Sequence, residues 1–78
     1  MNKLELIGII KSSLKTNKKI DMKSNSNNVD AWDSLGKLSI LITLDKKFKK
    51  KVSKLPKLAT AESVKEIYSV LKKAKLVK

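Results

Sequence analysis

The sequence predicts an all-α fold, a small bundle of three main helices and one short helix with a long loop between the first two helices. Apolar residues recur at helical spacing in three separate stretches of the chain. Residues that favour helix starts, Asp33 and Ser63 among them, precede two of these stretches. The 78 residues allow one small domain over 1–78, whose single core is near the lower size limit for folding without disulfides.

The first helix is expected over about residues 2–15. We expect one of its faces to pack in the core, and Leu6 to lie beside that face. The residues that share the face are Leu4, Ile7, Ile10 and Leu14.

Residues 16–33 are expected to form the long loop. They show no sustained helical period, and residues 23–28 are the most polar part of the chain. Connections of this length without secondary structure are uncommon in compact domains and are often functional. Four apolar residues spaced through the loop should hold it against the helices. They are Ile20, Met22, Val29 and Trp32.

The second helix is predicted over about residues 34–49. Asp33 is a natural N-cap, so Ser34 falls in the first helical turn, at the exit of the loop. The apolar residues at the spacing of one helical face are Leu35, Leu38, Leu41, Ile42 and Phe48.

A short helix at about 53–58 and a last helix at about 61–75 complete the bundle. Ser53 is a candidate cap for the short helix, and Pro56 is tolerated within its first turn. Leu55 and Leu58 are expected to face inward. The last helix has two candidate starts, Thr60 and Ser63, and Ser63 with Glu66 has the form of a capping box. The predicted buried face of the last helix is Val64, Ile67, Tyr68 and Leu71.

Composition excludes several kinds of chemistry. The chain has no cysteine and no histidine, so disulfides, Cys/His metal sites and thiol or imidazole catalysis are excluded. Asp30 and Asp33 are two loop carboxylates without further ligands, so we expect no metal site. No apolar run approaches the roughly 18 residues of a membrane span, and residues 1–6 lack a signal-peptide layout. We expect a soluble, cytoplasmic monomer.

The charge is strongly positive. Nineteen basic residues, all lysine, oppose seven acidic ones and give a formal charge of +12. Such an excess predicts attraction to polyanions, although solvated surface lysines arising from compositional bias would give the same count. Arginine is the usual residue where phosphates or base edges are gripped in fork geometry, so its absence argues against dedicated nucleic-acid readout.

The segment Trp32-Asp33-Ser34-Leu35-Gly36, followed by a Leu/Ile-rich helix that closes on Phe48, resembles the signature of acyl carrier proteins and peptidyl carrier domains. The resemblance covers nearly the whole chain. In that family the serine of Asp-Ser-Leu carries 4′-phosphopantetheine through a phosphodiester, and the matching residue is Ser34. The resemblance implies a carrier that is not itself an enzyme. A phosphopantetheinyl transferase would attach the arm, an activating enzyme would load an acyl or aminoacyl group as a thioester, and downstream acyl-transfer enzymes would use it.

Asp33, Leu35, Lys37 and Leu38 are the residues we expect to contact partner enzymes, because they adjoin Ser34. Typical fatty-acid carriers have an acidic second helix, whereas this helix carries Lys37, Lys46 and Lys47. Complementary charge raises association rates and like charge suppresses wrong partners. The cognate enzymes should therefore have acidic docking surfaces, which favours a specialised lipid, polyketide or other secondary pathway over housekeeping fatty-acid biosynthesis.

Two alternative functions remain open. The first is a small basic nucleic-acid-binding protein, which the +12 charge favours. The chain lacks the interleaved aromatic residues of a stacking surface and any known nucleic-acid-binding motif. The second is an unmodified carrier-like interaction subunit, which differs from a carrier only in the state of Ser34.

Overall fold

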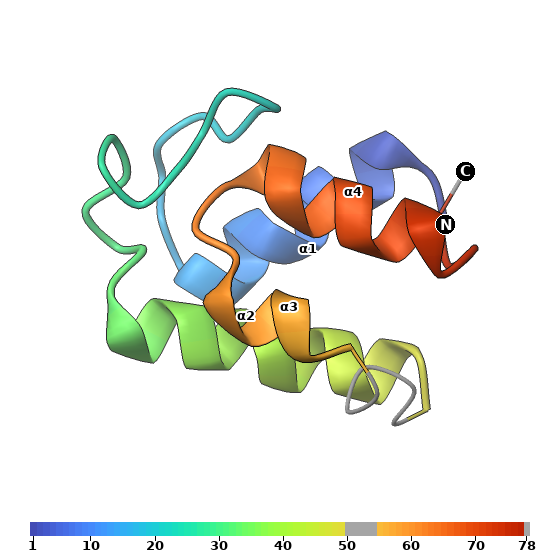
Figure 1. Cartoon of the computed structure of the whole chain (residues 1–78). Helices are drawn as coiled ribbons and strands as arrows, with labels where there is room; N and C mark the ends of the chain where they lie inside the picture. The colour runs from blue at the N-terminus through green and yellow to red at the C-terminus, as the bar shows by residue number, and fades with distance from the viewer. Residues whose placement is uncertain (50–54, 78) are drawn as a thin grey trace.

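A computed structural model describes residues 1–49 and 55–77 of the chain (Figure 1). Within these residues the chain forms four helices, α1 (Lys3–Leu14), α2 (Ser34–Lys47), α3 (Pro56–Thr60) and α4 (Val64–Lys73). The described residues contain no strand, and their single β-bridge joins Asn25 to Ser63. The predicted small all-α bundle, with three longer helices, one short helix and a long loop after the first, is confirmed.

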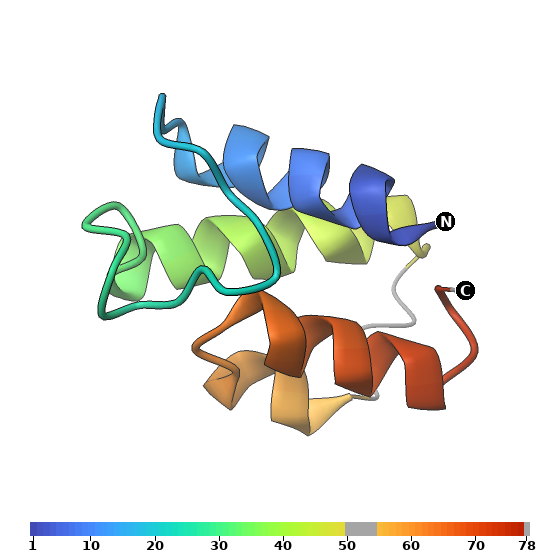
Figure 2. The ribbon, with the colours of Figure 1, turned by 90° about the horizontal axis from the view of Figure 1, so that it is seen from above.

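Each of the four described helices contacts two others. α1 lies beside α2 and runs in the opposite direction, and it also contacts α4, whereas α3 contacts both α2 and α4 (Figure 2). One apolar core joins all four helices and the loop. Its buried residues are Leu6, Ile10, Leu14, Ile20, Val29, Trp32, Ile40, Leu44, Leu58, Ala61, Val64, Ile67, Leu71 and Val77.

The ends of α1 and α2 lie within two residues of their predicted positions. Asn2 caps α1 by accepting a hydrogen bond from the Glu5 amide at 2.9 Å, and Lys15 ends it in the left-handed conformation with φ 52°. Asp33 caps α2, as predicted. α2 ends at Lys47, two residues before the predicted end.

The predicted bounds of α3 were wrong. Pro56 is its first residue and Leu55 its N-cap, without a side-chain hydrogen bond, while Ser53 lies outside the described residues. Proline fits the first helical position because its missing N–H would have no helical partner there. Leu58 is buried and Leu55 packs against the core, which confirms the inward face.

The last helix was predicted to begin too early and to end too late. Thr60 belongs to α3, so it does not start the last helix. Ser63 caps α4 instead: its Oγ accepts a hydrogen bond from the Glu66 amide at 3.1 Å, and its hydroxyl donates to the Glu66 carboxylate at 3.3 Å. α4 therefore begins at Val64, because Ala61 and Ser63 have extended backbone conformations, and it ends at Lys73. Val64, Ile67 and Leu71 are buried, and Tyr68 is half-buried.

The predicted core faces of α1 and α2 need correction. On α1, Leu6, Ile10 and Leu14 are buried, whereas Leu4 is 79% exposed. Both helices carry apolar residues around more than one face, so periodicity alone fits more than one buried stripe. On each helix the residues that packing buries are four positions apart.

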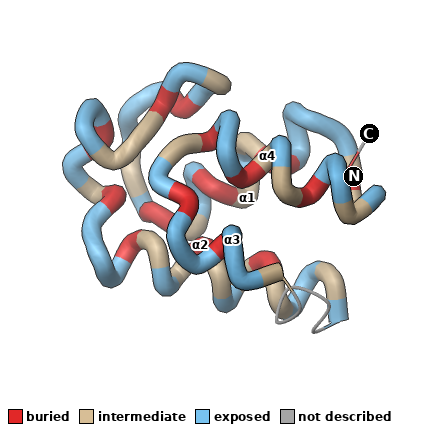
Figure 3. Tube along the Cα trace, in the orientation of Figure 1, coloured by how far each residue is buried: buried red, intermediate tan, exposed pale blue. Residues whose placement is uncertain are grey.

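On α2 the buried stripe is Gly36, Ile40 and Leu44. Leu41 and Phe48 are partly buried against it, but three residues of the predicted face lie on the surface. Leu35 is 75% exposed, Leu38 is 52% exposed and Ile42 is 48% exposed. The alternation of buried and exposed residues along the helices is visible in Figure 3.

The loop between α1 and α2 is held to the bundle by its apolar residues, as predicted. Ile20, Val29 and Trp32 are buried and Met22 is half-buried. The sequence did not reveal a second attachment, which is made by the backbone. The Val64 amide donates to the Ser24 carbonyl at 3.0 Å, and the Ser26 amide donates to the Glu62 carbonyl at 2.8 Å.

The asparagine-rich part of this loop is internally hydrogen-bonded. The Asn25 side chain accepts from the amides of Asn27 and Asn28 at 2.8 and 3.1 Å, and the Asn28 side chain accepts from the Asn25 amide at 2.9 Å. Short polar side chains commonly stabilise turns in this way. Residues 25–28 thus form a set of turns next to the start of α4.

Among the described residues, none of the helices combines the length and the apolar content that crossing a lipid bilayer requires.

Candidate functional site

Ser34 is the first residue of α2 and is exposed. The long loop leads into this end of α2 (Figure 1). Asp33 fixes this helix start through two hydrogen bonds. Its Oδ1 accepts from the Gly36 amide at 2.8 Å, and its carbonyl accepts from the Lys37 amide at 2.8 Å. Ser34 therefore presents a primary hydroxyl from a fixed backbone position.

The start of α2 is suited to a negatively charged group. The Gly36 amide donates its hydrogen bond to Asp33, whereas the amides of Ser34 and Leu35 have no partner in the part of the chain that the structure describes. Unpaired amides and the helix dipole favour an anion at a helix N-terminus by about 0.3–1 kcal/mol when the site is exposed. A phosphodiester on the Ser34 hydroxyl would lie beside these amides, so the residues present fit a phosphopantetheine arm.

Gly36 brings the start of α2 into close contact with the loop and with α1. A Cβ on this residue would overlap the carbonyl oxygen of Ala31 and lie 2.7 Å from Cδ2 of Leu14. A glycine in the first turn of a helix is unfavourable by propensity alone, so tight packing explains its presence. Our prediction of site residues did not include Gly36, and its low helix propensity was the available signal.

Trp32 anchors the end of the loop, two residues before Ser34, in the core. Its side chain is 3% exposed and belongs to the core. Its amide donates to the carbonyl of Val29 at 2.9 Å, which forms the turn that leads into Asp33. The Trp-Asp-Ser segment thus places a buried anchor, a cap and an exposed hydroxyl at consecutive positions.

The residues predicted to contact partners surround Ser34 unequally. Leu35 and Leu38 are well exposed, and Ile42 continues their stripe along the outer face of α2. Lys37 is held within the molecule, because its Nζ lies 3.6 Å from Glu62 Oε1 and 27% of its side chain is exposed. The structure thus brings Asp33, Leu35 and Leu38 to the surface beside Ser34 and turns Lys37 toward the segment between α3 and α4.

The lysines of α2 do not cluster at Ser34. Lys46 and Lys47 lie in its last turn, about 20 Å from Ser34 at 1.5 Å per residue. Near the loop, Lys18 forms an exposed ion pair with Asp30 at 3.7 Å. The surface around Ser34 is therefore apolar and mixed in charge, and the excess of lysine lies elsewhere.

Within residues 1–49 and 55–77 there is no group of three or more His, Cys, Asp or Glu side chains that could hold a metal ion. Three comparisons, with models of protein families, with curated proteins and with solved structures, gave no match for this chain.

Proposed function

We propose that this chain is a carrier protein that bears an acyl or aminoacyl group as a thioester on 4′-phosphopantetheine attached to Ser34. The observation that carries this proposal is the position of Ser34. It is an exposed serine at the first position of a capped helix, with unpaired amides behind it and two exposed leucines beside it. The arm would supply the thiol that the chain lacks.

In this function the chain contributes attachment and recognition. Ser34 is a passive acceptor, since the chain has no histidine to act as its base, and a phosphopantetheinyl transferase moves the arm from coenzyme A to its hydroxyl. Leu35 and Leu38 form an apolar contact surface next to the arm. The central part of a protein interface is more apolar than its rim, so two exposed leucines beside the arm suit such a contact.

The cognate enzymes differ from those of acidic carriers. The formal charge of +12 would slow the approach of an enzyme with a basic docking surface and speed that of an acidic one. We therefore assign the carrier to a specialised pathway, in which an activating enzyme and acyl-transfer enzymes with acidic surfaces load and unload it.

The decisive experiment measures the intact mass of the protein before and after incubation with coenzyme A, Mg²⁺ and a broad-specificity phosphopantetheinyl transferase. We expect a single phosphopantetheine increment on the wild type and on Ser12→Ala, a control for an exposed helical serine, and none on Ser34→Ala. A folded wild type that gains no mass, even with a transferase from its own source, contradicts the proposal.

The nucleic-acid-binding alternative is tested separately. Any polycation binds nucleic acid non-specifically and loses affinity as salt rises, so a gel shift at low salt does not distinguish the two functions. Sequence-selective binding that persists in Ser34→Ala at physiological salt would favour the alternative. An unmodified interaction subunit would instead bind its protein partner equally well with and without Ser34.

A further inference from the structure

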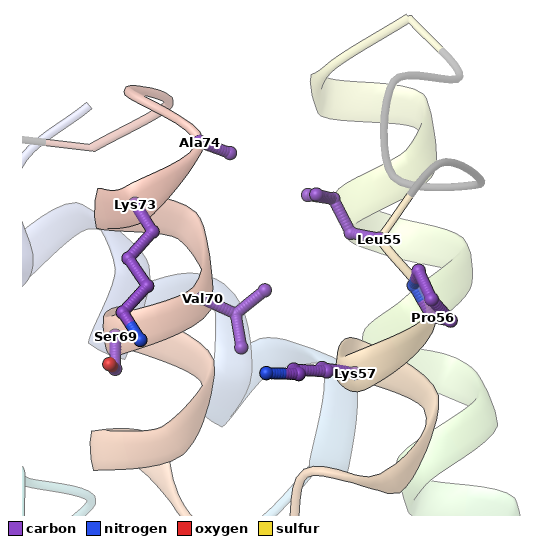
Figure 4. A pocket seen from close by; sticks show the side chains of 7 residues that line it. All are labelled: Leu55, Pro56, Lys57, Ser69, Val70, Lys73 and Ala74. Carbon is purple, nitrogen blue, oxygen red and sulfur yellow. The ribbon is translucent and has the colours of Figure 1, made fainter.

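A groove lies between α3 and α4. Its volume is about 310 Å³, near the lower end of the range for small-molecule sites. Figure 4 shows the residues that line it, which come from the start of α3 and the last two turns of α4. They are Leu55, Pro56, Lys57, Ser69, Val70, Lys73 and Ala74.

The groove is amphipathic. Leu55, Val70 and Ala74 give it an apolar end, and all three are half-buried. Figure 4 shows the ammonium group of Lys73 beside Ser69 and that of Lys57 in front of Val70, and both lie away from Ala74. Neither lysine forms an ion pair within the described residues. The groove therefore combines an apolar surface with two ammonium groups that have no ion-pair partner among the described residues.

We propose that this groove binds a free, single-chain aliphatic carboxylate, with the carboxylate between Lys57 and Lys73 and the chain along Leu55, Val70 and Ala74. Charge complementarity requires an anion, and the apolar end requires a hydrocarbon chain to cover it. The small volume favours one unbranched chain over a lipid with two.

The surrounding charges fix the direction of the bound molecule. A second, neighbouring pocket shares Lys57 and Lys73 with the groove and is also lined by Thr60 and Glu66, whose carboxylate repels an anion on that side. At the opposite end, the C-terminus of α4 near Ala74 carries the negative end of the helix dipole. The carboxylate is thus confined to the lysines, and the chain must extend toward Ala74.

This site is separate from Ser34. Ser34 begins α2 at one end of the molecule, whereas the groove opens beside the C-terminus of α4 at the other end (Figure 1). The groove does not depend on the carrier function, because its lining includes no residue of α2 or of the loop. Ser34→Ala should bind the carboxylate as the wild type does, so failure of either proposal leaves the other intact.

The test is an NMR titration of ¹⁵N-labelled protein with octanoate, kept below its micelle-forming concentration. We expect saturable amide shifts at Leu55, Val70 and Ala74, with little change at Ser34. Acetate, which lacks the chain, and 1-octanol, which lacks the charge, should each bind more weakly. Octanol binding as tightly as octanoate, or shifts that spread over all lysines without saturating, would overturn the proposal.

Two variants sharpen the test. Replacing both Lys57 and Lys73 by Gln should weaken octanoate binding about five-fold, since an exposed ion pair contributes about 0.2–1 kcal/mol. The matched control replaces Lys46 and Lys47 by Gln, which removes the same charge from a place outside the groove. Equal weakening in both double variants contradicts the site. Ala74→Phe should fill the apolar end of the groove and abolish saturable binding of octanoate. If the protein binds anionic vesicles but not octanoate, the two lysines contact a lipid surface instead, and the proposal is overturned.

Discussion

On α2, Gly36, Ile40 and Leu44 face the core, whereas Leu35, Leu38 and Ile42 face outward from the same helix. The two faces share residue types but differ in what they meet. The first contacts the other elements of the core, and the second has solvent in front of it. The buried face therefore sets the stability and position of α2, whereas the exposed face beside Ser34 contributes little to either.

The largest expected effect comes from shortening a leucine on the buried face. Leu44→Ala should lower the free energy of unfolding by about 2–5 kcal/mol, because Leu44 is completely buried and its removal leaves a cavity. Leu35→Ala, the same substitution on the exposed face, should change it by less than about 0.5 kcal/mol. Urea denaturation followed by circular dichroism measures both values, and similar losses would remove the distinction between the faces.

Gly36 tests how closely the buried face packs. Gly36→Ala should destabilise the protein by about 1–3 kcal/mol, because the added Cβ would overlap the Ala31 carbonyl. Gly8→Ala is the matched control, since a Cβ at this exposed position in α1 meets no atom within 4 Å. That substitution should stabilise the protein by up to about 1 kcal/mol through helix propensity. Thermal unfolding of the two variants should therefore shift in opposite directions.

The sequence predicted what depends on local chemistry. The cap at Asp33 was predicted, and Ser63 was one of two candidate caps for the last helix, because each side chain bonds an amide three residues ahead and the signal lies within one turn. The choice between Leu38 and Ile40 as a core residue depends on the elements packed against α2, and periodicity did not resolve it. The pairing of Ser24 with Val64 uses backbone groups alone, which every residue has.

In the candidate site, too, local features could be predicted from the sequence and contacts between distant residues could not. The position of Ser34 at a helix start could be predicted because it follows the cap by one residue. The ion pair of Lys37 with Glu62 could not, because it joins residues 25 positions apart that meet only when α2 packs against α3. The α3–α4 groove likewise arises from two elements that meet only in the folded chain.

A smaller effect on stability is expected at Asp33, the N-cap of α2. Asp33→Ala should cost about 1 kcal/mol in unfolding free energy, because the Gly36 amide loses its acceptor. Asp33→Asn keeps a capping oxygen and should cost little. If the carboxylate also serves the modifying enzyme, Asp33→Asn will slow the attachment of phosphopantetheine while the stability is retained. Attachment at the wild-type rate would limit Asp33 to its capping role.

The smallest effect on stability, and the most direct test of the exposed face, comes from making that face polar. Leu35→Ser and Leu38→Ser should each change the free energy of unfolding by about 0.5 kcal/mol or less, since both side chains are already in solvent. If these leucines contact the enzymes that modify or load the carrier, each substitution should still lower the rate of phosphopantetheine attachment, measured by intact mass over time. Ile42→Ser is the control, because it lies on the same stripe about 12 Å along the helix from Ser34. A rate that falls in the Leu35 and Leu38 variants but not in the Ile42 variant would place the contact beside the serine. Wild-type rates in all three variants would mean that the exposed apolar face has no part in recognition by the transferase.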